Sequence, residues 1–77
     1  MDPRIAIDPG VHFAKPCVAG TRIPVEAIIE LIEAGLSFDQ IRKDYYPDLT
    51  EEDLKACVRF ARNVLAAEEI HLSPSAS

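Results

Sequence analysis

The sequence predicts a mainly α-helical domain, a three-helix bundle of the helix-turn-helix type with a short N-terminal β or extended arm. The chain has 77 residues, 48% of them hydrophobic, and a net charge of -5, which suits one small folded domain and is too apolar for a disordered chain. The spacing of apolar residues changes from short runs to a helical period at Pro24. Two further breaks, at Gly35 and Pro47, divide the helical part into three.

Residues 1–23 are predicted to form the arm. Short apolar stretches at 4–7, 11–13 and 17–18 are separated by Asp8-Pro9-Gly10 and Lys15-Pro16, which favour turns. A sheet this small has unpaired edges, and such edges pair readily with a second chain. We therefore expect dimerisation through the arm.

The first helix is expected to run from Pro24, which suits the first helical position, to Gly35, which suits the residue after a helix end. Its apolar residues recur at i, i+3, i+4, i+7 and i+11 and form one stripe: Val25, Ile28, Ile29, Ile32 and Leu36. The opposite face carries an acidic stripe of Glu26, Glu30 and Glu33. Such a stripe repels phosphate, so this helix is not expected to bind nucleic acid.

The second helix is expected to begin after Ser37, which forms the signature of a capping box with Gln40. Phe38, Ile41 and Tyr45 are predicted to form its inner face. Pro47 prevents its continuation because proline lacks the amide that the next helical hydrogen bond needs.

The third helix is expected to start at Thr50, whose hydroxyl can cap it, and to have an acidic first turn at residues 51–53. It would run to about Ile70, so that residues 24–70 form the three-helix domain and residues 71–77 a flexible tail. Its predicted buried face is Leu54, Cys57, Val58, Ala61, Val64 and Leu65. In a helix-turn-helix protein this helix would lie in the major groove of DNA.

Several segments resemble a known family. They are Gly20-Thr21-Arg22-Ile23-Pro24-Val25, the run from Ala34-Gly35-Leu36-Ser37 to Tyr46-Pro47-Asp48-Leu49-Thr50, and Lys15-Pro16. Over about residues 4–68 the chain is similar to the prokaryotic family known as domain of unknown function 433. The resemblance implies a homeodomain-like three-helix fold with N-terminal strands, and some members are similar to VapB-type antitoxins that pair with a PIN-like nuclease. Ala14 and Ala19 depart from the family pattern, which commonly has a glycine and a basic residue there.

Arg22 is the first candidate for contact with a partner or with phosphate. It follows Gly20 and Thr21 just before a helix start, where free backbone amides and a guanidinium can hold phosphate or a carboxylate. The alternative is a purely structural turn in which Arg22 forms an ion pair.

The third helix provides three further candidates, Lys55, Arg59 and Arg62, which lie at i, i+4 and i+7 and line one outward face. They could contact DNA phosphate or an acidic partner. The alternative is a solvated face on which Glu51 and Glu52 neutralise them. DNA binding is opposed by the acidic first turn, because that turn would approach the bases. The acidic stripe of the first helix and this basic stripe could instead meet across a symmetric dimer, or the acidic stripe could match a basic toxin surface.

No catalytic site, metal site or cofactor is expected. His12 and His71 are far apart, and no Ser, Cys or carboxylate pair has the spacing of a nucleophile with its base or of a metal-ligand set. Cys17 and Cys57 are expected to be reduced thiols. No apolar run approaches the roughly 18 residues of a membrane span, and no secretion signal is recognised, so a cytoplasmic protein without a membrane or small-molecule partner is expected.

These features favour a non-enzymatic, antitoxin-like helix-turn-helix protein. We expect a homodimer that binds a PIN-like nuclease and, as a second role, its own operator DNA. The alternative is a protein-interaction or assembly module that does not bind DNA.

Overall fold

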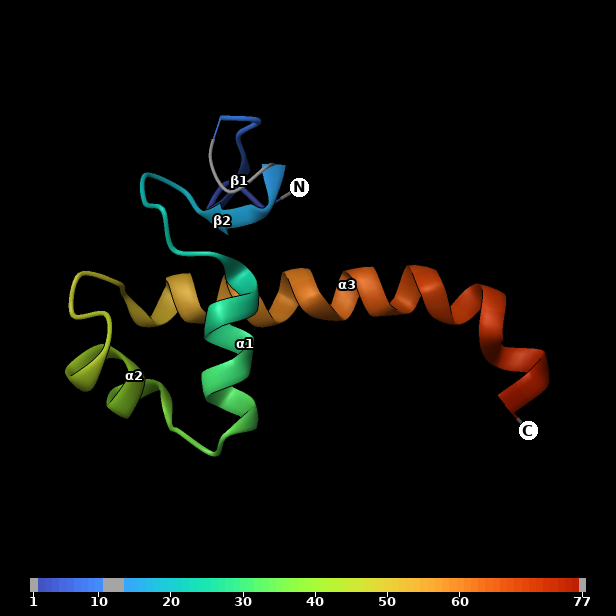
Figure 1. The fold of residues 1–77 in the computed structure, drawn as a ribbon. Helices are drawn as coiled ribbons and strands as arrows, with labels where there is room; N and C mark the ends of the chain where they lie inside the picture. Colours follow the sequence, from blue (N-terminus) through green and yellow to red (C-terminus); the bar gives the residue numbers. More distant parts are fainter. Residues whose placement is uncertain (1, 11–13, 77) are drawn as a thin grey trace.

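The structure, a computed structural model, describes residues 2–10 and 14–76 and confirms a mainly α-helical fold with a small N-terminal sheet. The order of elements is β1 (Ile5–Ile7), β2 (Pro16–Val18), α1 (Val25–Glu33), α2 (Phe38–Asp44) and α3 (Glu51–Ala76). Helix α1 crosses α3 steeply, the hairpin lies over the crossing, and α2 lies beside the first turns of α3 (Figure 1). The second half of α3 extends beyond the other elements (Figure 1). The predicted apolar stretch 11–13 lies outside the described residues.

The two strands form an antiparallel pair in which Ile5 lies opposite Val18 and Ile7 opposite Pro16. The other edge of β2 is also occupied, because the amide of Val18 donates to the carbonyl of Ile23 at 2.9 Å and Cys17 forms a bridge with Pro24. The strand pairing thus ties the arm directly to the start of α1.

Helix α1 begins one residue later than the prediction. Pro24 is its N-cap, with φ of -69° and ψ of 144°, because an extended backbone there keeps the bridge to Cys17. The end is as predicted: Gly35 has a φ of 96° and its amide donates to Ile32 O, while the Leu36 amide donates to Leu31 O. These two hydrogen bonds are a Schellman motif, which requires the left-handed conformation at Gly35.

Helix α2 has the predicted capping box, in which the Gln40 amide donates to Ser37 Oγ at 3.1 Å and the Ser37 amide donates to Gln40 Oε1 at 2.8 Å. The prediction that Tyr45 lies on the inner face is wrong, since Tyr45 is 52% exposed. The helix ends at Asp44, and the chain then turns so that Tyr46 packs against the core instead.

Helix α3 is capped by Thr50, whose Oγ1 accepts from the Asp53 amide while Asp53 Oδ2 accepts from the Thr50 amide. It continues to Ala76, beyond the predicted end near Ile70. The final turns bend away from the axis of α3 (Figure 1), as expected before Pro74.

The core lies where α1, α2, the first half of α3 and the strands meet. Its buried residues are Ile5, Val18, Val25, Ile28, Ile41, Leu49, Leu54, Ala56 and Cys57. The predicted buried face of α3 is therefore only partly correct, because Val58, Val64 and Leu65 are exposed and Ala56, which was not predicted, is fully buried. Val64 and Leu65 lie in the second half of this helix, which extends beyond the neighbouring elements (Figure 1).

Candidate functional site

The basic stripe of α3 is largely neutralised within the chain. Lys55 Nζ lies 3.2 Å from Glu51 Oε2 and 3.9 Å from Glu52 Oε1. The guanidinium of Arg59 donates from both Nε and Nη2 to Asp2 Oδ2, at 3.2 and 2.8 Å. Two of the three predicted α3 cations thus have carboxylate partners of their own.

Asp2 and Arg4 bind the arm to α3. Besides the Asp2–Arg59 pair, Arg4 Nη1 lies 3.0 Å from Asp53 Oδ1, the carboxylate that also caps α3. Hydrogen bonds from the Arg4 amide and from Arg59 hold the pKa of Asp2 below its ordinary value. Burial raises the pKa of Asp53, but hydrogen bonds from Thr50 and Arg4 outweigh it and lower that pKa overall. Both carboxylates are therefore favoured in their charged forms.

Arg62 and Arg22, the remaining predicted residues, lie on different elements. Both are exposed. Within the described part of the chain, the Arg62 side chain has no ion pair or hydrogen bond. Arg22 has an interaction of its own and lies in the turn between β2 and α1. The four predicted residues therefore lie on two different parts of the chain, the β2–α1 turn and α3, and they differ in their partners.

The turn that contains Arg22 has a clear structural role. Gly20 has a φ of 78°, and Thr21 donates to Val18 O from its amide and from its hydroxyl, at 3.0 and 2.8 Å. The Thr21 hydroxyl also accepts from the Ile23 amide at 3.0 Å. These bonds orient the chain for its bridge to β2, so the turn is explained without a bound anion.

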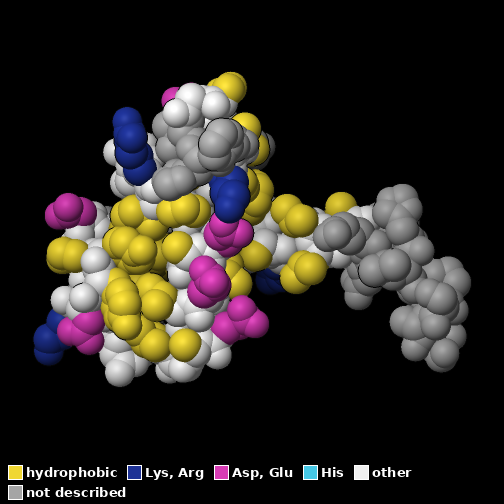
Figure 2. Space-filling model, in the orientation of Figure 1, with side chains coloured by type: hydrophobic (Ala, Val, Ile, Leu, Met, Phe, Trp, Pro, Cys, Tyr) yellow, Lys and Arg dark blue, Asp and Glu magenta, His cyan; other side chains and the backbone are white. Residues whose placement is uncertain are grey.

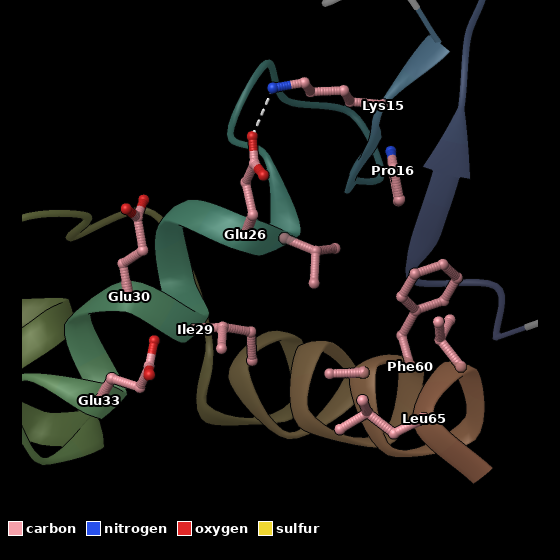
Figure 3. A pocket seen from close by; sticks show the side chains of 11 residues that line it. Lys15, Pro16, Glu26, Ile29, Glu30, Glu33, Phe60 and Leu65 are labelled. Carbon is pink, nitrogen blue, oxygen red and sulfur yellow. Dashed lines mark hydrogen bonds and ion pairs between the residues drawn. The ribbon is translucent and has the colours of Figure 1, made fainter. Parts of the chain in front are cut away.

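An apolar groove lies between α1 and α3. It encloses about 430 Å³ beneath Pro16 and has a floor formed by both helices (Figure 3). The floor residues are Val25 and Ile29 of α1 with Phe60, Ala61, Val64 and Leu65 of α3. Val64 is 42% exposed and Leu65 is 65% exposed, so apolar surface continues from the groove along α3.

One edge of the groove is acidic. It is formed by Glu26, Glu30 and Glu33, which project from successive turns of α1 (Figure 3). Lys15 Nζ lies 2.6 Å from Glu26 Oε1, and this hydrogen bond raises the pKa of Lys15. In the described part of the chain Glu30 and Glu33 have no ion pair. Acidic side chains accordingly form a row over α1, next to apolar atoms of α3 (Figure 2).

The sequence predicted the acidic stripe that borders this groove but not the groove itself. It assigned Val64 and Leu65 to the core because they continue the apolar period of α3. The available signal was length: the apolar stripe of α3 is longer than the nine residues of α1 can cover.

The cysteines are not suited to a reactive role. Both Cys17 and Cys57 are free and buried. Burial, together with the nearby charges of Asp53 and Asp2, raises the pKa of Cys57 to about 11. A thiol with that pKa is protonated near neutral pH and is a poor nucleophile or ligand. The described residues also contain no group of three or more His, Cys, Asp or Glu side chains that could hold a metal ion.

The fold and the groove define a small three-helix domain with an N-terminal hairpin. The chain belongs to the family of proteins of unknown function DUF433, which it matches over residues 5–61. This match confirms the resemblance found in the sequence. No curated protein and no solved structure matches the chain. Within the described residues, no helix is both long and apolar enough to cross a membrane.

Proposed function

We propose that this protein is an antitoxin-like binding module whose α1–α3 groove receives a segment of a PIN-like nuclease. It acts as a non-enzymatic cytoplasmic protein and is a homodimer through its arm. The family resemblance supports a nuclease as the partner, and the apolar groove between α1 and α3 supports this surface as the one that binds it. The observation that carries the proposal is the apolar groove, which is continuous with exposed Val64 and Leu65.

Exposed apolar surface of this kind favours a protein partner. Contiguous apolar patches with a polar border mark interaction sites on small soluble proteins. The described residues Val64 and Leu65 of α3 support the same conclusion, because a helix with exposed apolar side chains gains stability when a partner covers them.

Operator binding is the subordinate part of the proposal, and the geometry gives it less support. The helix that would enter the major groove begins with three acidic residues, Glu51, Glu52 and Asp53. Lys55 and Arg59 already have carboxylate partners, so a phosphate would have to replace them. The alternative is an interaction module that binds a protein partner but no DNA. It does not require Lys55 and Arg59 to leave their carboxylate partners.

The test is co-purification of the full chain with the product of an adjacent PIN-like nuclease gene, with affinity measured by calorimetry. Leu65→Ser removes apolar contact area in the groove, and the expected loss is about 10- to 100-fold, from the roughly 1.5–3 kcal/mol of a fully buried leucine. Val58→Ser is the matched control, since Val58 is an exposed apolar residue of the same helix outside the groove lining. An unchanged affinity for Leu65→Ser, or equal losses for both variants, contradicts binding at the groove.

A further inference from the structure

We propose that the segment received by the α1–α3 groove is a basic amphipathic helix of a different protein, recognised by its apolar side and by a row of Lys or Arg along one edge. This inference rests on the proposed function and specifies the chemistry of the partner. Three observations support it: the apolar floor of the groove, the negative charge of one edge of the groove, and the net negative charge of the chain.

The floor requires an apolar side on the occupant. The groove lies between two crossing helices, and its floor side chains come from both of them (Figure 3). Ile29 projects from α1 toward α3, with Phe60 and Leu65 on the α3 side. A third helix packs into such a groove with residues at i, i+3, i+4 and i+7, which is the usual mode of helix-in-groove recognition.

The acidic edge requires positive charge on one side of that helix. Glu26, Glu30 and Glu33 lie at i, i+4 and i+7, so they extend over about 10 Å of α1. Basic residues at the same spacing on an adjacent helix would lie opposite them. Glu30 and Glu33 lack an ion pair in the described part of the chain, so they can accept such partners without breaking an existing one.

A second copy of this chain offers little of that charge, because its Lys55 and Arg59 are already paired with Glu51 and Asp2. Its α1 carries the same acidic row, so a symmetric contact of groove with groove would place like charges together. Its exposed α3 segment contributes Arg62, but the sequence continues with Glu68 and Glu69. The chain as a whole has a net charge of -5. A heterologous partner with a basic helix is therefore favoured over self-association at this surface, because like charges oppose association.

The experiment measures binding of two labelled helical peptides to the full chain by fluorescence anisotropy. Both peptides have about 18 residues, enough for five turns, and the same leucine side. One carries Lys and the other Glu along the edge. We expect the Lys peptide to bind and the Glu peptide to bind at least about tenfold more weakly. Absence of binding by the Lys peptide, or equal binding of the two, overturns the inference.

Two charge-reversed variants separate a local effect from a general one. The double variant Glu30→Lys, Glu33→Lys is expected to bind the Lys peptide about tenfold more weakly, because two attractions between charges become repulsions. Asp44→Lys with Asp48→Lys produces the same change in net charge at exposed positions outside the groove, and a loss below about threefold is expected. Equal losses in both double variants overturn the inference, since they indicate attraction by net charge alone.

Leu65→Ser distinguishes failure of this inference from failure of the proposed function. If Leu65→Ser weakens peptide binding and the Glu30→Lys, Glu33→Lys variant does not, the groove binds an apolar helix without selecting basic residues. The inference then fails and the proposed function stands. If Leu65→Ser changes neither peptide binding nor nuclease binding, the groove is not the binding site, and both fail.

Discussion

Ala14 has a backbone conformation that is unfavourable for alanine. Its φ is 67°, in the left-handed region, at the position where the family pattern commonly has glycine. A side chain with a Cβ is strained there and glycine is not. The alanine at position 14 therefore lowers the stability of the fold slightly and does not indicate a new function.

We expect Ala14→Gly to raise the free energy of unfolding by about 0.5–1 kcal/mol, since removing the Cβ relieves strain that exceeds the added entropy of the unfolded chain. Urea denaturation measures this change in the free energy of unfolding. Gly35→Ala is the complementary change, because Gly35 has a φ of 96° in the Schellman motif, and it is expected to lower stability by about 1 kcal/mol. A loss of stability in Ala14→Gly would contradict the strain.

At the level of elements, the arm and α3 depend on one another through two ion pairs, Asp2 with Arg59 and Arg4 with Asp53. Asp53 also closes the capping box with Thr50, so one carboxylate serves both the helix start and the arm. The short strands of the arm have few hydrogen bonds of their own. Besides the packing of Ile5 and Val18 in the core, the position of the arm on α3 therefore depends on these carboxylates remaining charged.

This dependence predicts a loss of stability in acid. The pKa values of Asp2 and Asp53 are lowered in the folded chain, so the unfolded chain binds more protons near the ordinary value of 3.8. The stabilisation is complete above that value and is lost as the pH falls through the lowered pKa values. Denaturation at several pH values between neutral and about 3 should show a decline in stability that is less steep in Asp53→Asn. This variant should also cost up to about 1 kcal/mol at neutral pH, because the start of α3 and Arg4 lose a negative charge. Asp48→Asn, at an exposed position, should leave the decline unchanged. An equally steep decline in Asp53→Asn contradicts this role.

The basic stripe of α3 leads to a prediction about DNA. Were Arg22, Lys55, Arg59 and Arg62 all to contact phosphates, log affinity would fall with log salt with a slope of roughly -3.6. Because Lys55 and Arg59 are paired with carboxylates, we expect weak binding of upstream operon DNA and a slope no steeper than about -2. Asp2→Asn, which removes the partner of Arg59, should make the slope steeper. A steep slope in the unaltered protein would restore α3 as a DNA-binding helix.

At the level of the whole molecule, the predicted homodimer and the proposed groove use different surfaces. Ile7 in β1 is 45% exposed at the arm, away from the groove lining. We expect Ile7→Lys to lower the mass measured by light scattering from that of a dimer to that of a monomer, because a charge on an edge strand opposes pairing. Groove binding of the Lys peptide should remain. A dimer that persists in Ile7→Lys but is lost when Lys55, Arg59 and Arg62 are changed to Glu would place the interface on the stripes of α1 and α3.

The sequence by itself determined the local structure of this protein. The capping residues Ser37 and Thr50 and the stop at Gly35 were predictable because each acts within four or five residues of chain. The mainly helical class and the family followed from similarly local patterns. The acidic stripe of α1 was predictable for the same reason, since i, i+4 and i+7 spacing places residues on one helix face wherever that helix lies.

Only the tertiary structure decided which of these faces are covered. Val64 and Leu65 have the same period as buried Leu54 and Cys57, but α1 is too short and crosses α3 too steeply to cover them. Likewise Arg59 is a candidate phosphate ligand in the sequence and the partner of Asp2, 57 residues away, in the fold. Burial and ion pairing between distant segments depend on where elements end and how they cross, and the period of a single helix contains no information about either.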